Sequence, residues 1–64
     1  AIKKGRIASA LAAVKQYPAY QRDDLQSSIV DLIADSLLLA RESHLDYAEI
    51  VERAVQHYEI EVPS

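Results

Sequence analysis

The stretch from residue 24 to residue 43 most constrains the fold, because its apolar residues recur with a helical period. One face of the predicted helix carries an apolar stripe, and further apolar residues lie outside that stripe. The stripe consists of Leu25, Ile29, Leu32, Ile33, Ser36, Leu37 and Ala40, and the residues beyond it are Val30, Leu38 and Leu39. A helix that is apolar on more than one side is normally buried on more than one side.

The rest of the chain is too short to cover both sides. With 64 residues it forms one domain, residues 1–64, and a domain of this size buries only about 60% of the surface of its unfolded chain. It has no cysteine, which excludes disulfides and cysteine-based zinc sites. Oligomerisation is therefore the expected source of extra stability. We predict a homodimer whose interface includes Ile29, Val30, Ile33, Leu37, Leu38, Tyr17 and Tyr20.

Two shorter helices are predicted on either side of the long one. In residues 2–16, Ile7, Leu11 and Val14 have i, i+4, i+7 spacing, and residues 47–58 carry a longer stripe of the same kind. Residues 59–64 read as a fraying tail that ends at Pro63. The predicted fold class is all-α, with three helices at about 2–16, 24–43 and 47–58, a capped helical hairpin, and packing as a helical dimer.

Several local signals place the turn of the hairpin at Asp46. Asp46 is a good helix cap, and Glu49 lies three residues later, in capping-box spacing. Leu45 before the cap and Ile50 at the fourth helical position match a hydrophobic staple. The agreement of these signals predicts a helix that starts directly after Asp46.

The segment around Pro18 allows two interpretations. The residue before a proline avoids the helical region, so Tyr17 is an expected boundary. The next helix could start at Pro18 itself, since proline suits the first helical position. It could instead start after Asp23 or Asp24, with Asp23 and Gln26 in capping-box spacing, and residues 17–22 as a connector. We favour the second interpretation.

Charge and hydropathy argue against two classes of partner. The net charge is −3, and the one basic cluster is Lys3, Lys4 and Arg6, so nucleic-acid binding is not expected. No apolar run approaches the roughly 18 residues of a membrane span, so no membrane partner is expected. Together with the lack of cysteine, this favours a cytoplasmic location.

One polar stripe of the long helix has the spacing of a metal site. Asp24, Ser28, Asp31 and Asp35 share a side, and carboxylates one turn apart can hold Mg²⁺. Asp31 and Asp35 are the candidate ligands, although a solvated polar face explains the pattern more simply. The two histidines, His44 and His57, fall on different predicted segments and read as surface residues. No catalytic residue and no cofactor are predicted.

Four segments of the chain resemble a group of small, uncharacterised bacterial and phage-encoded helical proteins. They are Asp31-Leu32-Ile33-Ala34-Asp35, Leu45-Asp46, Arg53-Ala54 and His57-Tyr58. The resemblance covers about half of the chain. It implies an all-helical fold and an accessory role in mobile elements, with no assigned activity.

The same hairpin is similar to the last two helices of the MazG-like all-α nucleoside triphosphate pyrophosphatases, where Asp31 would take the position of a metal-binding Asp. That family also needs a Glu-x-x-Glu pair on the preceding helix, whereas residues 2–22 contain no Glu, and Ser27 or Ser28 stands where an acidic partner is required. We therefore predict a non-catalytic helical protein-interaction or assembly module. The alternatives are a Mg-dependent pyrophosphatase-like protein and an acidic inhibitor that mimics nucleic acid.

Overall fold

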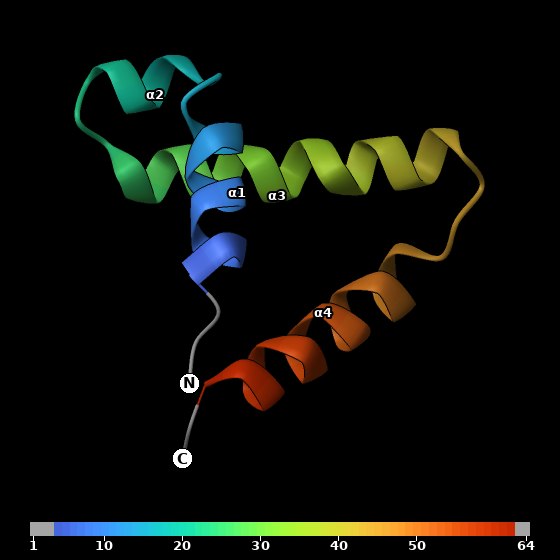
Figure 1. The fold of residues 1–64 in the computed structure, drawn as a ribbon. Helices are drawn as coiled ribbons and strands as arrows, with labels where there is room; N and C mark the ends of the chain where they lie inside the picture. Colours follow the sequence, from blue (N-terminus) through green and yellow to red (C-terminus); the bar gives the residue numbers. More distant parts are fainter. Residues whose placement is uncertain (1–3, 63–64) are drawn as a thin grey trace.

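The computed structural model describes residues 4–62 and forms α1 (Lys4–Val14), α2 (Pro18–Gln21), α3 (Leu25–Glu42) and α4 (Tyr47–Glu61), as Figure 1 shows. Helices cover 81% of the described residues, and no strand occurs among them. The predicted all-α fold class is confirmed. None of the helices in this part of the chain has the length and apolarity needed to cross a membrane.

The expected count of three helices is corrected by α2. Residues 18–21 form a short helix with Pro18 at its start, where we had favoured a connector. Tyr17 is extended, with φ −97° and ψ 138°, as expected for a residue before proline. Proline has no N–H to lose at a first helical position, and its fixed φ already suits the helix. The single turn of α2 is stabilised by the burial of Ala19.

The turn between α2 and α3 uses two aspartates in different ways. Asp23 adopts a left-handed conformation with φ 58°. The N–H groups of Asp23 and Asp24 donate to the carbonyls of Tyr20 and Ala19 at 3.0 Å each, which is the Schellman pattern that ends a helix. Asp24 then caps α3, because its Oδ1 accepts from the Ser27 N–H at 3.0 Å. The cap is thus Asp24, and the Asp23–Gln26 pair does not serve as a capping box.

The α3–α4 turn repeats this arrangement. His44 is left-handed with φ 59°, and the N–H groups of His44 and Leu45 donate to the Arg41 and Ala40 carbonyls at 3.1 and 2.8 Å. Asp46 Oδ1 then accepts from the N–H groups of Ala48 and Glu49, at 3.0 and 3.2 Å. The predicted cap at Asp46 is confirmed. The staple between Leu45 and Ile50 stays a prediction.

The outer ends of the chain differ from the expected boundaries. α4 continues to Glu61, three residues beyond the predicted end, so residues 59–61 are not a frayed tail. The side chain of Glu61 is 19% exposed and lies 3.5 Å from Arg6 Nε of α1, which ties the last turn of α4 to α1. α1 ends at Val14, and its expected start at residues 2–3 lies outside the described residues, as do Pro63 and Ser64.

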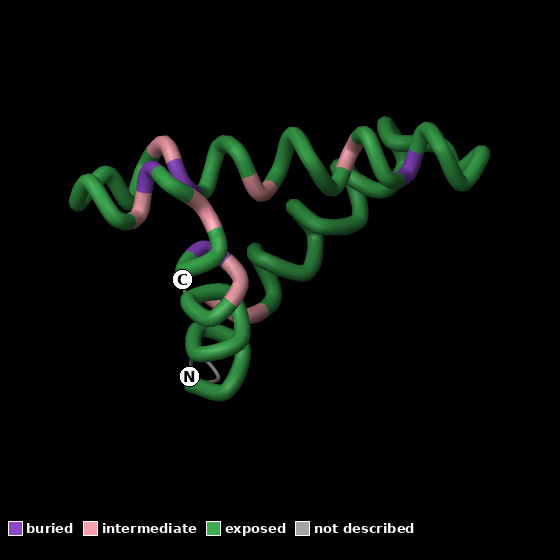
Figure 2. The backbone as a smooth tube through the Cα atoms, turned by 90° about the horizontal axis from the view of Figure 1, so that it is seen from above, coloured by how far each residue is buried: buried purple, intermediate pink, exposed green. Residues whose placement is uncertain are grey.

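α1, α3 and α4 form an open, three-sided arrangement. α1 runs across α3, while α4 leaves the far end of α3 and slants back toward α1 (Figure 1). Most of the tube in Figure 2 is exposed, α4 almost entirely. The buried residues in the described part of the chain are Val14, Ala19, Ser28 and Ala40, and no leucine, isoleucine or tyrosine is among them. The arrangement therefore lacks the packed centre that a folded domain normally has.

Candidate interaction surface

A hollow lies between α3 and α4 and is lined almost wholly by apolar side chains. Its volume is about 430 Å³. We call it the apolar groove. α3 contributes Leu32, Ile33, Ser36 and Leu37, and α4 contributes Ile50, Val51, Ala54, Val55 and Tyr58.

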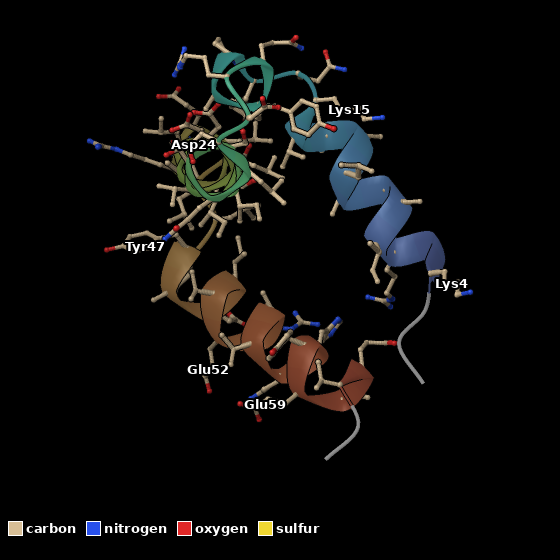
Figure 3. The ribbon with its side chains drawn as sticks, turned by 90° about the vertical axis from the view of Figure 1, so that its left-hand side faces the viewer. Lys4, Lys15, Asp24, Tyr47, Glu52 and Glu59 are labelled. Carbon is tan, nitrogen blue, oxygen red and sulfur yellow. The ribbon has the colours of Figure 1, made fainter. Side chains whose placement is uncertain are left out.

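Two further hollows lie between α1 and the other two long helices. One, of about 190 Å³, lies between α1 and α3 and is lined by Ile7, Ala10, Leu11, Val14, Leu25 and Ile29. The other, of about 440 Å³, lies between α1 and α4. It shares Ala54 and Tyr58 with the apolar groove, and Ile7 and Ala10 with the first hollow. The shared residues make the hollows parts of one concave surface. Figure 3, which looks along α3, shows the labelled Glu52 and Glu59 on the outer side of α4, away from this surface.

Most large side chains of the apolar groove remain exposed, whereas Leu32 and Leu37 are half-buried. Ile33 is 53% exposed, Val55 49% and Tyr58 66%. Scattered exposed apolar residues are ordinary, but contiguous apolar patches on a soluble chain mark interaction sites. The concave side is therefore the candidate interaction surface.

The residues predicted for the interface are distributed over several places. Ile33 and Leu37 line the apolar groove, and Ile29 lines the hollow beside α1. Val30 and Leu38 are 57% and 59% exposed and line none of these hollows. Tyr17 and Tyr20 are half-buried next to α2. The structure thus brings only part of the predicted set together.

The α4 side of the apolar groove was not among the predicted interface residues. Val51, Val55 and Tyr58 belong to a stripe that we expected to pack against α3 within the same chain. The spacing of that stripe was visible in the sequence. What the spacing does not give is the angle at which the hairpin opens and leaves the stripe uncovered.

Two residues of the polar stripe of α3, Ser28 and Asp35, make structural contacts. Ser28 is fully buried, and its hydroxyl donates to the Asp24 carbonyl at 2.8 Å. The Tyr17 hydroxyl donates to Asp35 Oδ2 at 2.7 Å, which holds the start of the α2 segment on α3. That hydrogen bond, with the nearby carboxylate charges, raises the pKa of Tyr17 above its ordinary value. Asp35 thus serves as an acceptor in a contact between segments.

The two hydrogen bonds from Ser27 act on the Asp24 cap. The Ser27 N–H and the Ser27 hydroxyl both donate to the carboxylate, the hydroxyl at 2.8 Å, and they lower the pKa of Asp24. Within residues 4–62, no group of three or more His, Cys, Asp or Glu side chains is placed to hold a metal ion. Asp31 and Asp35 are both exposed, and His57 lies beside Arg6 and Glu61, away from them.

The basic cluster is divided. Lys3 lies outside the described residues, Lys4 is exposed at the start of α1, and Arg6 is paired with Glu61.

A comparison of the chain with protein-family models, with curated proteins and with solved structures finds no match.

Proposed function

We propose that this chain is a non-catalytic helical assembly module that works as a homodimer. The observation that carries the proposal is the amount of surface that the single chain leaves exposed. A compact monomer of 7.1 kDa is expected to expose about 4,100 Å². This chain exposes 5527 Å².

The dimensions of the chain agree with its surface area. A compact domain of 64 residues is expected to have a radius of gyration of about 10.7 Å, and the chain has 13.0 Å. The excess surface, roughly 1,400 Å² per chain, is what each partner buries in a large homodimer, where the total is about 2,000–5,000 Å². A second copy is therefore sufficient to cover what the monomer leaves uncovered.

The polar side chains support a structural role as well. Asp24 and Asp46 cap helices, Tyr17 and Asp35 bind each other across segments, and Arg6 pairs with Glu61. Each of these groups starts a helix or fixes one segment against another, as expected of an assembly module. The cytoplasmic location and the resemblance to bacterial and phage-encoded helical proteins stay predictions.

Sedimentation equilibrium of the full chain tests this function. The expected result at micromolar concentration is a species of twice the chain mass of 7.1 kDa, with the helical content of the structure seen by circular dichroism. A well-folded species of single chain mass over the whole range would contradict the proposal.

A further inference from the structure

We infer that the apolar groove is filled by the α3–α4 hairpin of a second copy, so that two hairpins form a four-helix bundle. This inference rests on the proposed homodimer and adds which face forms it. The face contains Ile33 and Leu37 of α3 together with Val51, Val55 and Tyr58 of α4. It excludes Leu38, which we had predicted for the interface from the sequence.

The chemistry of the apolar groove favours a chain with an apolar face as its occupant. None of its lining residues is charged, and the Ser36 hydroxyl already donates to the Leu32 carbonyl at 2.7 Å. Sites for small molecules carry a few polar groups that fix the ligand's orientation, and the Tyr58 hydroxyl is the one such group left here. The hollow between α1 and α4 is different, because Arg6, His57 and Glu61 line it.

The spacing of the apolar residues indicates that the occupant lies along the helices. On α3, Ile33, Leu37 and Ala40 follow one another at steps of four and three residues, and on α4 Val51, Val55 and Tyr58 repeat the same steps. This is the heptad spacing of helices that pack at about 20° to each other in bundles. α1 crosses α3 and does not run alongside α3 and α4 (Figure 1).

Symmetry favours a second copy over a different protein. In a twofold dimer the same patch occurs on both partners, so it must carry both the hollow and the side chains that fill it. The apolar groove meets this condition. It is closed near the turn, where Ala40 is buried, and α4 diverges from α3 toward its other end (Figure 1). Ile33 and Tyr58, both more than half exposed, are available to enter the partner's groove.

Two serine-to-cysteine variants of the full chain test the inference, since the sequence has no native cysteine. Ser36 lines the apolar groove, whereas Ser43 is exposed at the C-cap of α3 outside it. In the dimer, Ser36→Cys should react with a thiol reagent roughly tenfold or more slowly than Ser43→Cys, because a covered thiol reacts only when the interface opens. The protection should disappear on dilution to the monomer.

A pair of charge variants gives a second readout. Ile33→Glu should weaken association at least about a hundredfold, because it places an unpaired charge in the interface. Leu38→Glu lies on the same helix about 140° away and should change association by no more than about threefold. Folding is checked by circular dichroism, and the cysteine pair keeps the test decisive if Ile33→Glu does not fold.

The outcomes separate the inference from the proposed function. A wild-type chain that stays monomeric would refute the homodimer itself. A wild-type dimer in which Ser36→Cys reacts as fast as Ser43→Cys, or in which Leu38→Glu dissociates the dimer and Ile33→Glu does not, would refute the groove alone. If Ser36→Cys is protected from the thiol reagent only in the dimer, the result supports both the homodimer and the apolar groove as its interface.

Discussion

Two aspartates determine where the long helices start. Asp24 directly follows the left-handed Asp23, and Asp46 lies two residues after the left-handed His44, so both turns end one helix and cap the next within a few residues. A non-glycine residue in the left-handed region is strained, and each turn recovers that cost through its backbone hydrogen bonds. The signals for Asp46 were fully local and could be read from the sequence, whereas the left-handed conformations of Asp23 and His44 could not.

The cap at Asp46 should contribute measurably to stability. Asp46→Ala removes the acceptor of the Ala48 and Glu49 N–H groups and should lower the free energy of unfolding by about 1 kcal/mol. Asp46→Asn keeps an acceptor and should stay close to the wild type. Urea denaturation at one fixed chain concentration measures both. Equal losses in the two variants would show that the cap hydrogen bonds are not the cause.

The Asp24 cap predicts a pH dependence at the acidic end. Because the pKa of Asp24 is lower in the folded chain than in the unfolded chain, its stabilisation is complete above the unfolded value, about 3.9, and is lost as the pH falls through the folded pKa. The advantage of the wild type over Asp24→Asn should therefore shrink between about pH 5 and pH 2. Thermal unfolding of both proteins across this range measures it. Parallel pH profiles would contradict the assignment.

At the scale of elements, the sequence predicted α3 and α4 because each combines a long apolar period with a local cap. It misplaced residues 17–22, since the stability of a four-residue helix such as α2 depends on contacts that a local pattern does not contain. Ala19 is 2% exposed and Ser28 is fully buried, so the α2 segment packs on the first turns of α3. A serine within a polar stripe gave no sign of that burial.

The buried position of Ser28 can be tested against a matched serine. Ser28→Val adds volume where there is no space, and should lower the free energy of unfolding by about 1–3 kcal/mol. The Asp24 carbonyl keeps the Ser28 N–H as a donor at 3.1 Å, so the loss measures packing. Ser9 makes the same kind of bond, to the Gly5 carbonyl at 3.0 Å, but is exposed. Ser9→Val should change stability by no more than about 0.5 kcal/mol in the same urea titration.

For the whole molecule, the central fact is that the helices form while their apolar faces remain uncovered. The two-sided pattern of α3 indicated this from the sequence. Ile33 and Leu37, two of the residues predicted for the interface, line the apolar groove, and their part in an interface stays a prediction. The contribution of α4 was missed, because the sequence pattern does not contain the angle between α3 and α4. Such long-range geometry leaves no trace in residue spacing.

A chain with so little buried surface should gain much of its stability from association. Obligate dimers have no stable folded monomer, and their unfolding midpoint depends on concentration. The decisive measurement is thermal unfolding by circular dichroism over a dilution series of at least a hundredfold in chain concentration. For the homodimer, we expect the midpoint to fall steadily on dilution, and helix content and dimer to be lost together. A midpoint independent of concentration, with full helix content in a chain of single mass, would contradict it.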